Sequence, residues 1–320
     1  MVISIHVSEA HAVKQEFYIK NFNFLLANLW YGLSCSAVPL FVMISGRYAL
    51  NRKNSEYKKY YVKIFKKIYI PAIFWSVFYM ILRYYFQNIS IKKIINATIG
   101  GAPFYHLWYL YMMIGIYLLV PFLVKLKEKM KEKNFEKLGI LLVIISFIMV
   151  IFRDFSSLAN IGLLKYYWKF NQFKFINYLG YFILGYSLKK IKINKKVKRY
   201  FLIISIIFIF ISLFFFKDKY ILIYDTNYIW MVFYSISIYL FFLDIKINKY
   251  KSLSFLEKYN FDIYLIHPII LNFILEKFRL QEKVLWLKIP FLITITFIFS
   301  LLLALVLNII IKKIKNKIKI

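Results

Sequence analysis

The chain has 320 residues, of which 62% are hydrophobic and 21% aromatic, and its formal net charge at pH 7 is +31. In a soluble protein such a charge suggests nucleic-acid binding. Here the lysines cluster between apolar runs of membrane-spanning length, so membrane topology explains the charge better and no nucleic-acid partner is expected. Cys35 is the only cysteine, which excludes an internal disulfide and a thiolate metal cluster.

Apolar segments follow one another along the whole chain, and each is predicted to be a helix. Their approximate bounds are 1–13, 27–50, 68–87, 104–124, 138–153, 173–188, 199–216, 228–244, 261–276 and 287–311. Several are shorter than an ideal span, which tilt or local bilayer thinning accommodates. No repeat or linker divides the chain. The predicted fold class is therefore all-α, a polytopic helical bundle of about ten transmembrane helices in a single domain, 1–320.

The basic residues between these segments predict the orientation of the bundle. Alternate connections hold 30 of the 45 Lys and Arg residues, and the connections with the excess are expected in the cytoplasm. Lys58, Lys129 and the C-terminal tail are then cytoplasmic, whereas Lys92 and Lys217 are on the opposite side.

The second segment ends in the sequence AVPLFVMISGR, at Ala37–Arg47. Ser45, Gly46 and Arg47 are predicted to interrupt its helix just before a basic loop that runs to Lys67. Gly46 permits close approach of a backbone or ligand, Ser45 supplies a hydroxyl, and Arg47 supplies a fixed positive charge. This pattern indicates a site for a phosphorylated ligand at the cytoplasmic face. The alternative is a plain helix end with a snorkelling arginine.

The first segment contains His6, with Glu9 about one turn further along. Ionisable residues at membrane depth indicate function, and imidazole suits a general base near neutral pH. The alternative is a histidine hydrogen-bonded to water at the outer interface. His6 and His11 are five residues apart, which is not the spacing of a metal site on one helix face. The segment is too short for a full span, so we expect a misassigned start codon, or else a chain that begins partway through a helix.

Two further histidines occur in aromatic or proline-containing contexts. His106 precedes Trp108 and Tyr109 at the start of the fourth segment, where an aromatic belt is the simplest interpretation. His267 stands directly before Pro268, which breaks the backbone ladder and can expose a carbonyl to a cavity, although a plain kink is an equal alternative. No nucleotide loop, serine-hydrolase elbow or zinc motif is present.

Four stretches in order resemble the acyltransferase-3 family, the multi-pass bacterial membrane enzymes that O-acetylate surface and envelope polysaccharides. They are VISIHVS at the start, AVPLFVMISG in the second segment, HLWYLYMMIGIYLLVPFL in the fourth and FDIYLIHPII in the ninth, with GYFILGYSL at 180–188 as a weaker fifth. The resemblance implies a ten-helix core in the bacterial cytoplasmic membrane. It also implies acetyl-CoA as co-substrate, no permanently bound cofactor or metal, and a hydroxyl of a glycan or lipid-linked saccharide as acceptor.

The same resemblance implies roles for His6 and for three lysines. His6 matches the family's catalytic histidine, and Lys63, Lys66 and Lys67 match its basic motif for the phosphates of the donor. The candidate residues are then His6 for catalysis, Ser45, Arg47, Lys63, Lys66 and Lys67 for the acyl donor, and Trp108, Tyr109, Tyr264 and His267 as a substrate or structural motif.

Three departures from the family pattern leave alternatives open. The chain has no arginine upstream of His6, the basic motif is all lysine, and Cys35 stands where relatives often have arginine. The first departure keeps an inactive truncated homologue as one alternative. The other is a transporter or flippase of a lipid-linked glycan, although the two matching halves typical of transporters are not found.

Overall fold

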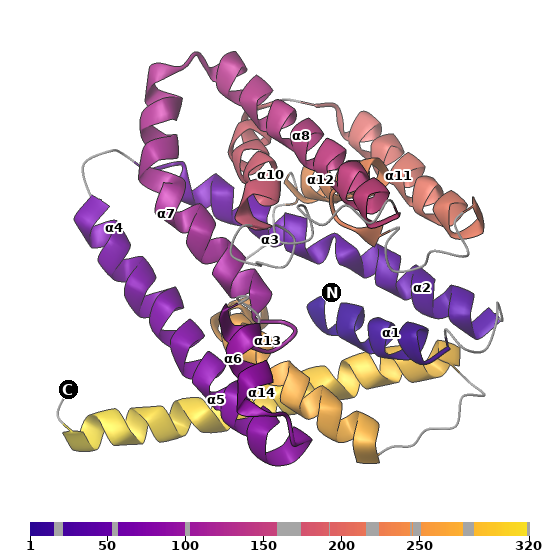
Figure 1. Ribbon diagram of the computed structural model, residues 1–320. Coiled ribbons are helices and arrows are strands. Elements are labelled where there is room, and N and C mark those ends of the chain that lie inside the picture. The colour runs from indigo at the N-terminus through magenta and orange to yellow at the C-terminus, as the bar shows by residue number, and fades with distance from the viewer. Residues whose placement is uncertain are drawn as a thin grey trace. The chain divides into compact units, whose positions relative to one another are not determined.

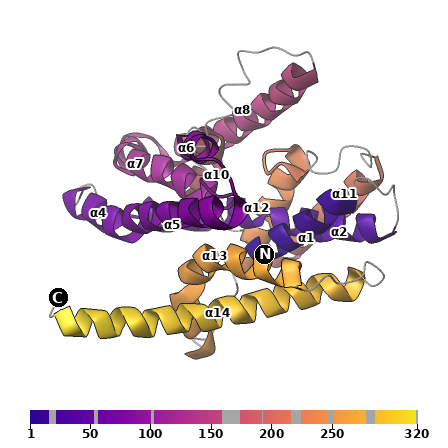
Figure 2. The same cartoon turned by 60° about the horizontal axis from the view of Figure 1, so that its bottom comes forward.

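The computed structural model is all-α, and no strand occurs among the residues it describes (Figures 1 and 2). These residues are 1–15, 22–52, 57–99, 103–158, 174–191, 193–215, 224–243, 245, 251–277 and 285–318. Each of the predicted apolar segments contains a helix, which confirms that the fold is all-α. The helices form two compact units.

The first unit comprises Met1–Ala37, Ile206–Asp225 and Asp244–Ile320. Its complete helices are α1 (Val2–Gln15), α2 (Phe22–Cys35), α13 (Lys251–Lys277) and α14 (Leu285–Ile318), and it also holds the second half of α11 (Lys195–Phe215). Helix α1 packs against α2, α13 and α14, and α13 packs along α14 (Figure 2). Residues from the two ends of the sequence therefore meet within this unit.

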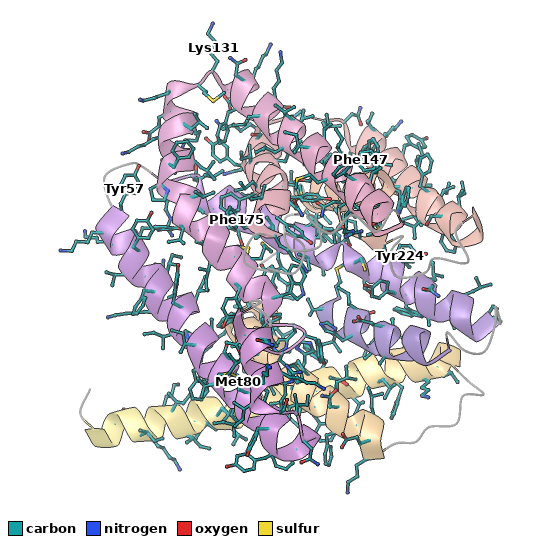
Figure 3. The ribbon with its side chains drawn as sticks, viewed as in Figure 1. Tyr57, Met80, Lys131, Phe147, Phe175 and Tyr224 are labelled. Carbon is teal, nitrogen blue, oxygen red and sulfur yellow. The ribbon has the colours of Figure 1, made fainter. Side chains whose placement is uncertain are left out.

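The second unit comprises Val38–Ser205 and Thr226–Leu243. Its helices are α3 (Ala37–Ala49), α4 (Tyr57–Ile64), α5 (Ile70–Gln87), α6 (Ile91–Ile99), α7 (Trp108–Lys129), α8 (Glu132–Leu158), α10 (Phe175–Ser187) and α12 (Ile229–Leu243), with short turns at η1 (Phe65–Tyr69) and η3 (Leu188–Lys190). Helix α10 is enclosed by its neighbours and packs against α8 and α7. A Cβ at Gly115 of α7 would come within 2.5 Å of the Phe175 ring, the residue labelled in Figure 3.

Five helical stretches are long and apolar enough to cross a membrane among the described residues, which supports the membrane class. They are Leu25–Ala49, Tyr57–Phe86, Trp108–Lys129, Glu132–Asp154 and Leu287–Ile314, and α12 is a shorter apolar helix. The expected count of about ten spans is not established by these five and stays a prediction, as does the single domain.

The predicted 27–50 segment is two helices, because the chain turns at Ser36 between α2 and α3. The Ser36 hydroxyl donates to the carbonyl of Leu33 at 3.4 Å and so competes with the continuing helix. Pro39 follows in the first turn of α3, where its missing N–H costs no helical hydrogen bond.

The basic stretch up to Lys67 is largely helical, whereas the sequence predicted a loop. Helix α4 begins at Tyr57, labelled in Figure 3, and three tyrosines attach it to α7. Tyr57, Tyr60 and Tyr61 donate to the carbonyls of Pro121, Tyr117 and Leu118 at 3.4, 3.3 and 3.0 Å. Because proline lacks an N–H, Pro121 leaves the carbonyl four residues earlier without its helical donor, and the Tyr60 hydroxyl takes that place.

The Ser45–Arg47 stretch does not interrupt its helix, since α3 continues to Ala49. Instead, Gly46 is a crossing point with α10. A Cβ there would come within 1.9 Å of the Phe182 carbonyl oxygen, and a Cβ at Gly185 within 2.0 Å of the Met43 carbonyl oxygen. Each glycine thus allows the backbone of the opposite helix to approach closely, the usual role of small residues between membrane helices.

Candidate active site

His6 lies on α1 with Glu9 on the same face, because residues three apart on a helix are neighbours. The His6 Nδ1 atom is 3.3 Å from Glu9 Oε2, and the two side chains are 13% and 41% exposed. In this geometry the carboxylate accepts a hydrogen bond from the Nδ1–H group. The Nε2 atom of the neutral ring then carries the lone pair that a general base needs.

His267 of α13 stacks on His6, with ring centroids 5.4 Å apart and an interplanar angle of 23°. It is completely buried, and its Nδ1 is 2.7 Å from the carbonyl oxygen of Tyr264. Pro268 has no N–H, so the carbonyl of Tyr264, four residues earlier, lacks its helical donor. The His267 Nδ1–H donates to this carbonyl, which fixes the tautomer of the ring.

Pro268 predicts a backbone carbonyl without its helical hydrogen bond. This is the Tyr264 carbonyl, and it accepts a hydrogen bond from His267 instead. The structure brings together His6, Tyr264 and His267, three candidates from opposite ends of the chain, with Tyr264 and His267 rings 6.0 Å apart. The sequence pattern did not predict a role for Glu9. Its position three residues after His6 was the signal that could have identified it.

Further polar contacts of α1 and α2 lie within the same unit. The hydroxyls of Ser34 and Ser4 are hydrogen-bonded at 2.7 Å and link α2 to α1 in a buried position. The phenol of Tyr31 is hydrogen-bonded to the Cys35 thiol, and the Glu9 carboxylate acts electrostatically on both groups.

Tyr224, labelled in Figure 3, lies in the described segment just before α12 in the chain and packs against α2. Its ring lies edge-on to Tyr31 at 6.0 Å, and a Cβ at Gly32 would come within 2.7 Å of it. Burial raises the pKa of the Tyr224 phenol above its ordinary value. The hydroxyl therefore stays protonated and available as a hydrogen-bond donor near neutral pH.

The predicted donor residues all lie in the second unit. Ser45 is half-buried and hydrogen-bonded to the side chain of Tyr117, and Arg47 is half-buried beside the Tyr239 hydroxyl, its hydrogen-bond partner. These two residues therefore join α3 to α7 and α12. A set of exposed lysines follows on α4 and η1, namely Lys63, Lys66 and Lys67.

Other basic residues near these helix ends were not singled out in the sequence. The Arg52 guanidinium lies 5.0 Å from the centroid of the Tyr60 ring, and Lys127 donates to the Leu50 carbonyl at 2.7 Å. Lys190 is hydrogen-bonded to the Glu132 carboxylate, which raises the pKa of this lysine. A basic side chain with a structural partner of this kind is not recognisable from the linear sequence.

Trp108 and Tyr109, at the start of α7, contact different neighbours. The Trp108 ring lies 6.1 Å from the Tyr178 ring with Lys174 Nζ 4.8 Å above it, and Tyr109 lies 6.4 Å from Phe41. Both are half-buried in the second unit. Within the described part of the chain, no group of three His, Cys, Asp or Glu side chains is placed to hold a metal ion.

A helical chain with several apolar spans and an ionisable histidine–glutamate pair defines a membrane protein with a candidate acid–base site. The family model described as "Acyltransferase domain" matches residues 1–306, nearly the full length. The chain belongs to this acyltransferase-3 family, and membership supports a membrane acyltransferase. Neither the search of curated proteins nor that of solved structures found a match.

Proposed function

We propose that this protein is a membrane O-acetyltransferase that moves an acetyl group from cytoplasmic acetyl-CoA to a hydroxyl of a cell-envelope or surface glycan. The observation that carries the proposal is the His6–Glu9 hydrogen bond in a chain that belongs to an acyltransferase family. Its proposed setting is a core of about ten helices in the bacterial cytoplasmic membrane, with the C-terminus in the cytoplasm.

In the proposed reaction, His6 Nε2 takes the proton of the acceptor hydroxyl as its oxygen attacks the acetyl thioester carbonyl. The new bond joins the hydroxyl oxygen to the acetyl carbon, and the carbon–sulfur bond of the thioester breaks. The proton on His6 then passes to the leaving thiolate of coenzyme A. The Glu9 carboxylate accepts a hydrogen bond from Nδ1–H throughout, so it keeps the base in one tautomer and stabilises the imidazolium that forms.

His267 has a positioning role in this proposal. Its own Nδ1–H is used by the Tyr264 carbonyl, so the ring is held in place from within α13. Stacking at 5.4 Å gives the His6 ring a flat surface to rest on. The Glu9 hydrogen bond and this stacking together restrict the orientation of the base, as efficient proton transfer requires.

The acetyl-CoA phosphates are assigned to the exposed lysines of α4 and η1, because exposed ammonium groups can pair with phosphate from the aqueous side. Ser45 and Arg47 have partners on α7 and α12, so their proposed contribution is to hold the end of α3 in place. The residues proposed to bind acetyl-CoA are therefore Lys63, Lys66 and Lys67.

Replacing these three lysines together with glutamine should raise the apparent KM for acetyl-CoA about tenfold, since each exposed ammonium contributes about 0.5 kcal/mol. The acceptor KM should change much less. Steady-state kinetics in membranes would measure both constants. The matched control replaces the exposed Lys129, Lys131 and Lys133, which removes equal charge elsewhere. An equal rise in donor KM for both triple variants would return all these lysines to a topological role.

Lys58 and Lys129 should face the cytoplasm and Lys92 the opposite side, as the charge bias predicts. All three side chains are exposed, so single cysteines there can be labelled. Lys217, the fourth position of that prediction, lies outside the described residues. Cys35 is buried and would be replaced by serine to leave one thiol per variant. Modification of position 129 in intact cells by an impermeant maleimide would contradict the orientation.

The direct test of the function is transfer of radiolabelled acetyl from acetyl-CoA to envelope glycan, in membranes from a strain that lacks its own enzyme. Incorporation that requires the protein is the expected result. Silence in this assay, together with protein-dependent movement of a lipid-linked saccharide across vesicles, would favour the transport alternative. Silence in both assays would favour an inactive homologue.

A further inference from the structure

A second polar cluster lies within the second unit, where α8 ends and where α7, α10 and α12 begin. We call it the aromatic cluster, and it comprises Trp108, Asp154, Asn177, Tyr178, Tyr228 and Trp230. None of these residues belongs to the His6 site or to the lysines assigned to the donor. Two observations about them indicate a ligand.

The first observation is a stacked pair of aromatic rings beside a carboxylate. The rings of Tyr228 and Trp230 are stacked, with centroids 4.8 Å apart and an interplanar angle of 6°. The Tyr228 hydroxyl donates to the carboxylate of Asp154, which also accepts from Arg153 Nε at 2.7 Å. Asp154 is 24% exposed, so its carboxylate is only partly covered.

The second half of the cluster is connected to the first through Tyr178. Its ring lies 6.1 Å from Trp108, and its hydroxyl is 2.6 Å from the Thr226 hydroxyl. The chain then continues from Thr226 to Tyr228. The two aromatic pairs are therefore joined by the Tyr178–Thr226 hydrogen bond and the backbone from Thr226 to Tyr228.

The second observation is the buried amide of Asn177, on the face of α10 that also carries Lys174 and Tyr181. Asn177 lies three residues after Lys174 and four before Tyr181, and helical periodicity places all three on one face. Lys174 covers Trp108, and the Tyr181 hydroxyl donates to the Thr226 carbonyl. The Asn177 side chain is only 3% exposed, and its Oδ1 has no hydrogen-bond partner among the described residues. Buried amide oxygens ordinarily have a partner, so this atom calls for one.

Flat aromatic rings beside a carboxylate and an amide match the chemistry of a sugar ring. A pyranose presents a face of C–H groups, which packs on an aromatic face, and a rim of hydroxyls, which donate to carboxylate and amide oxygens. A membrane-interface belt needs the aromatic residues, but it needs neither the Asp154 carboxylate nor the buried Asn177 amide.

We propose that the aromatic cluster is a saccharide-binding site that takes a pyranose unit of the acceptor glycan. The inference rests on the proposed function for the identity of its ligand as an acceptor. Binding itself requires no acetyl donor and can be measured separately.

The test is isothermal titration calorimetry on the purified full chain without acetyl-CoA. The probes are maltotriose, chitotriose and a partial hydrolysate of the host's envelope polysaccharide. At least one probe should bind, and Trp230→Leu and Asp154→Asn should each weaken its binding about tenfold, the effect of losing one stacking or charged hydrogen-bonding contact. Tyr178→Phe, which removes one hydroxyl, tests the same cluster with less risk to folding. Trp75→Leu on α5, where the ring contacts Phe78, is the matched control and should bind normally.

No binding of any probe would overturn the proposal, as would parental affinity in both cluster variants, which would leave an aromatic belt only. Weakening by Trp75→Leu equal to that by Trp230→Leu would also overturn it, because the effect would not be local. If saccharide binds but the parental chain transfers no acetyl group, the proposed enzyme activity fails and the saccharide site stands. If transfer requires His6 but no saccharide binds at the cluster, the site fails and the enzyme stands.

Discussion

Replacing His6 with alanine should lower acetyl transfer roughly 10²- to 10⁴-fold, the usual effect of losing a positioned general base. One imidazole is a small part of the packing of α1 against α2, α13 and α14, so the variant should insert and fold as the parent does. Glycan acetylation in membranes, normalised to the amount of protein, is the measurement. The largest part of the loss should be in kcat, because the base acts in the chemical step.

Glu9→Gln separates positioning from base chemistry at the same site. Glutamine keeps the size of the side chain but cannot stabilise an imidazolium as a carboxylate does, so kcat should fall while the acceptor KM changes little. Glu9→Asp should recover part of the activity if the charge is what matters. A purely structural Glu9 would instead show lower stability with a parental kcat.

His106→Ala is the control for removing a histidine. This residue is buried between Tyr79 and Phe104 in the second unit, with ring centroids at 5.0 and 5.8 Å. Its loss should reduce stability and leave kcat per folded protein near the parental value. Near-parental acetylation by His6→Ala, with acetylation abolished in His106→Ala, would move the catalytic assignment to the start of α7.

Gly46→Ala should destabilise the second unit by about 3 kcal/mol, at the upper end of overpacking effects. The added methyl group would lie 1.9 Å from the Phe182 carbonyl oxygen, and backbone atoms cannot rotate away as a side chain can. The two helices must therefore separate. The midpoint of thermal unfolding in detergent, followed by size-exclusion chromatography after heating, would report the loss.

Gly139→Ala is the matched control, since its added methyl group would meet the Ile183 side chain at 2.9 Å and a side chain can adjust. Gly185→Ala, on the opposite helix of the same crossing, should cost about as much as Gly46→Ala. The double variant should cost clearly less than the sum, because helices separated by the first methyl group leave room for the second. A parental melting midpoint with weaker acetyl-CoA binding in Gly46→Ala would show that a ligand, not α10, approaches this glycine.

The helical class was predictable from composition and period because a membrane-embedded backbone must satisfy its own hydrogen bonds, and apolar runs of this length do so as helices. Pro268 could be read in the same way. A proline in a helix removes one N–H, so an opened carbonyl four residues earlier follows from local geometry alone. The sequence did not reveal which hydrogen-bond donor would pair with that carbonyl. The structure places His267 Nδ1 there, on the Tyr264 carbonyl.

The basic stretch shows where local reasoning failed. A run of lysines between apolar segments resembles a loop, because charge is normally placed outside the bilayer. The tyrosines at 57, 60 and 61 make it a helix by donating to carbonyls of α7, including the one opened by Pro121. Helix formation there depends on a partner far along the chain, which periodicity within the stretch does not reveal.

By itself the sequence determined that the protein is helical and membrane-embedded, and it identified His6 as the ionisable residue to examine. These properties follow from composition, local spacing and a single ionisable ring in an apolar run, all of which are local. Only the tertiary structure decided that His267 stacks on His6, and that Gly46 of α3 lies against the Phe182 carbonyl of α10. Such pairs join distant parts of the chain through close packing, and packing depends on the shapes of both partners at once.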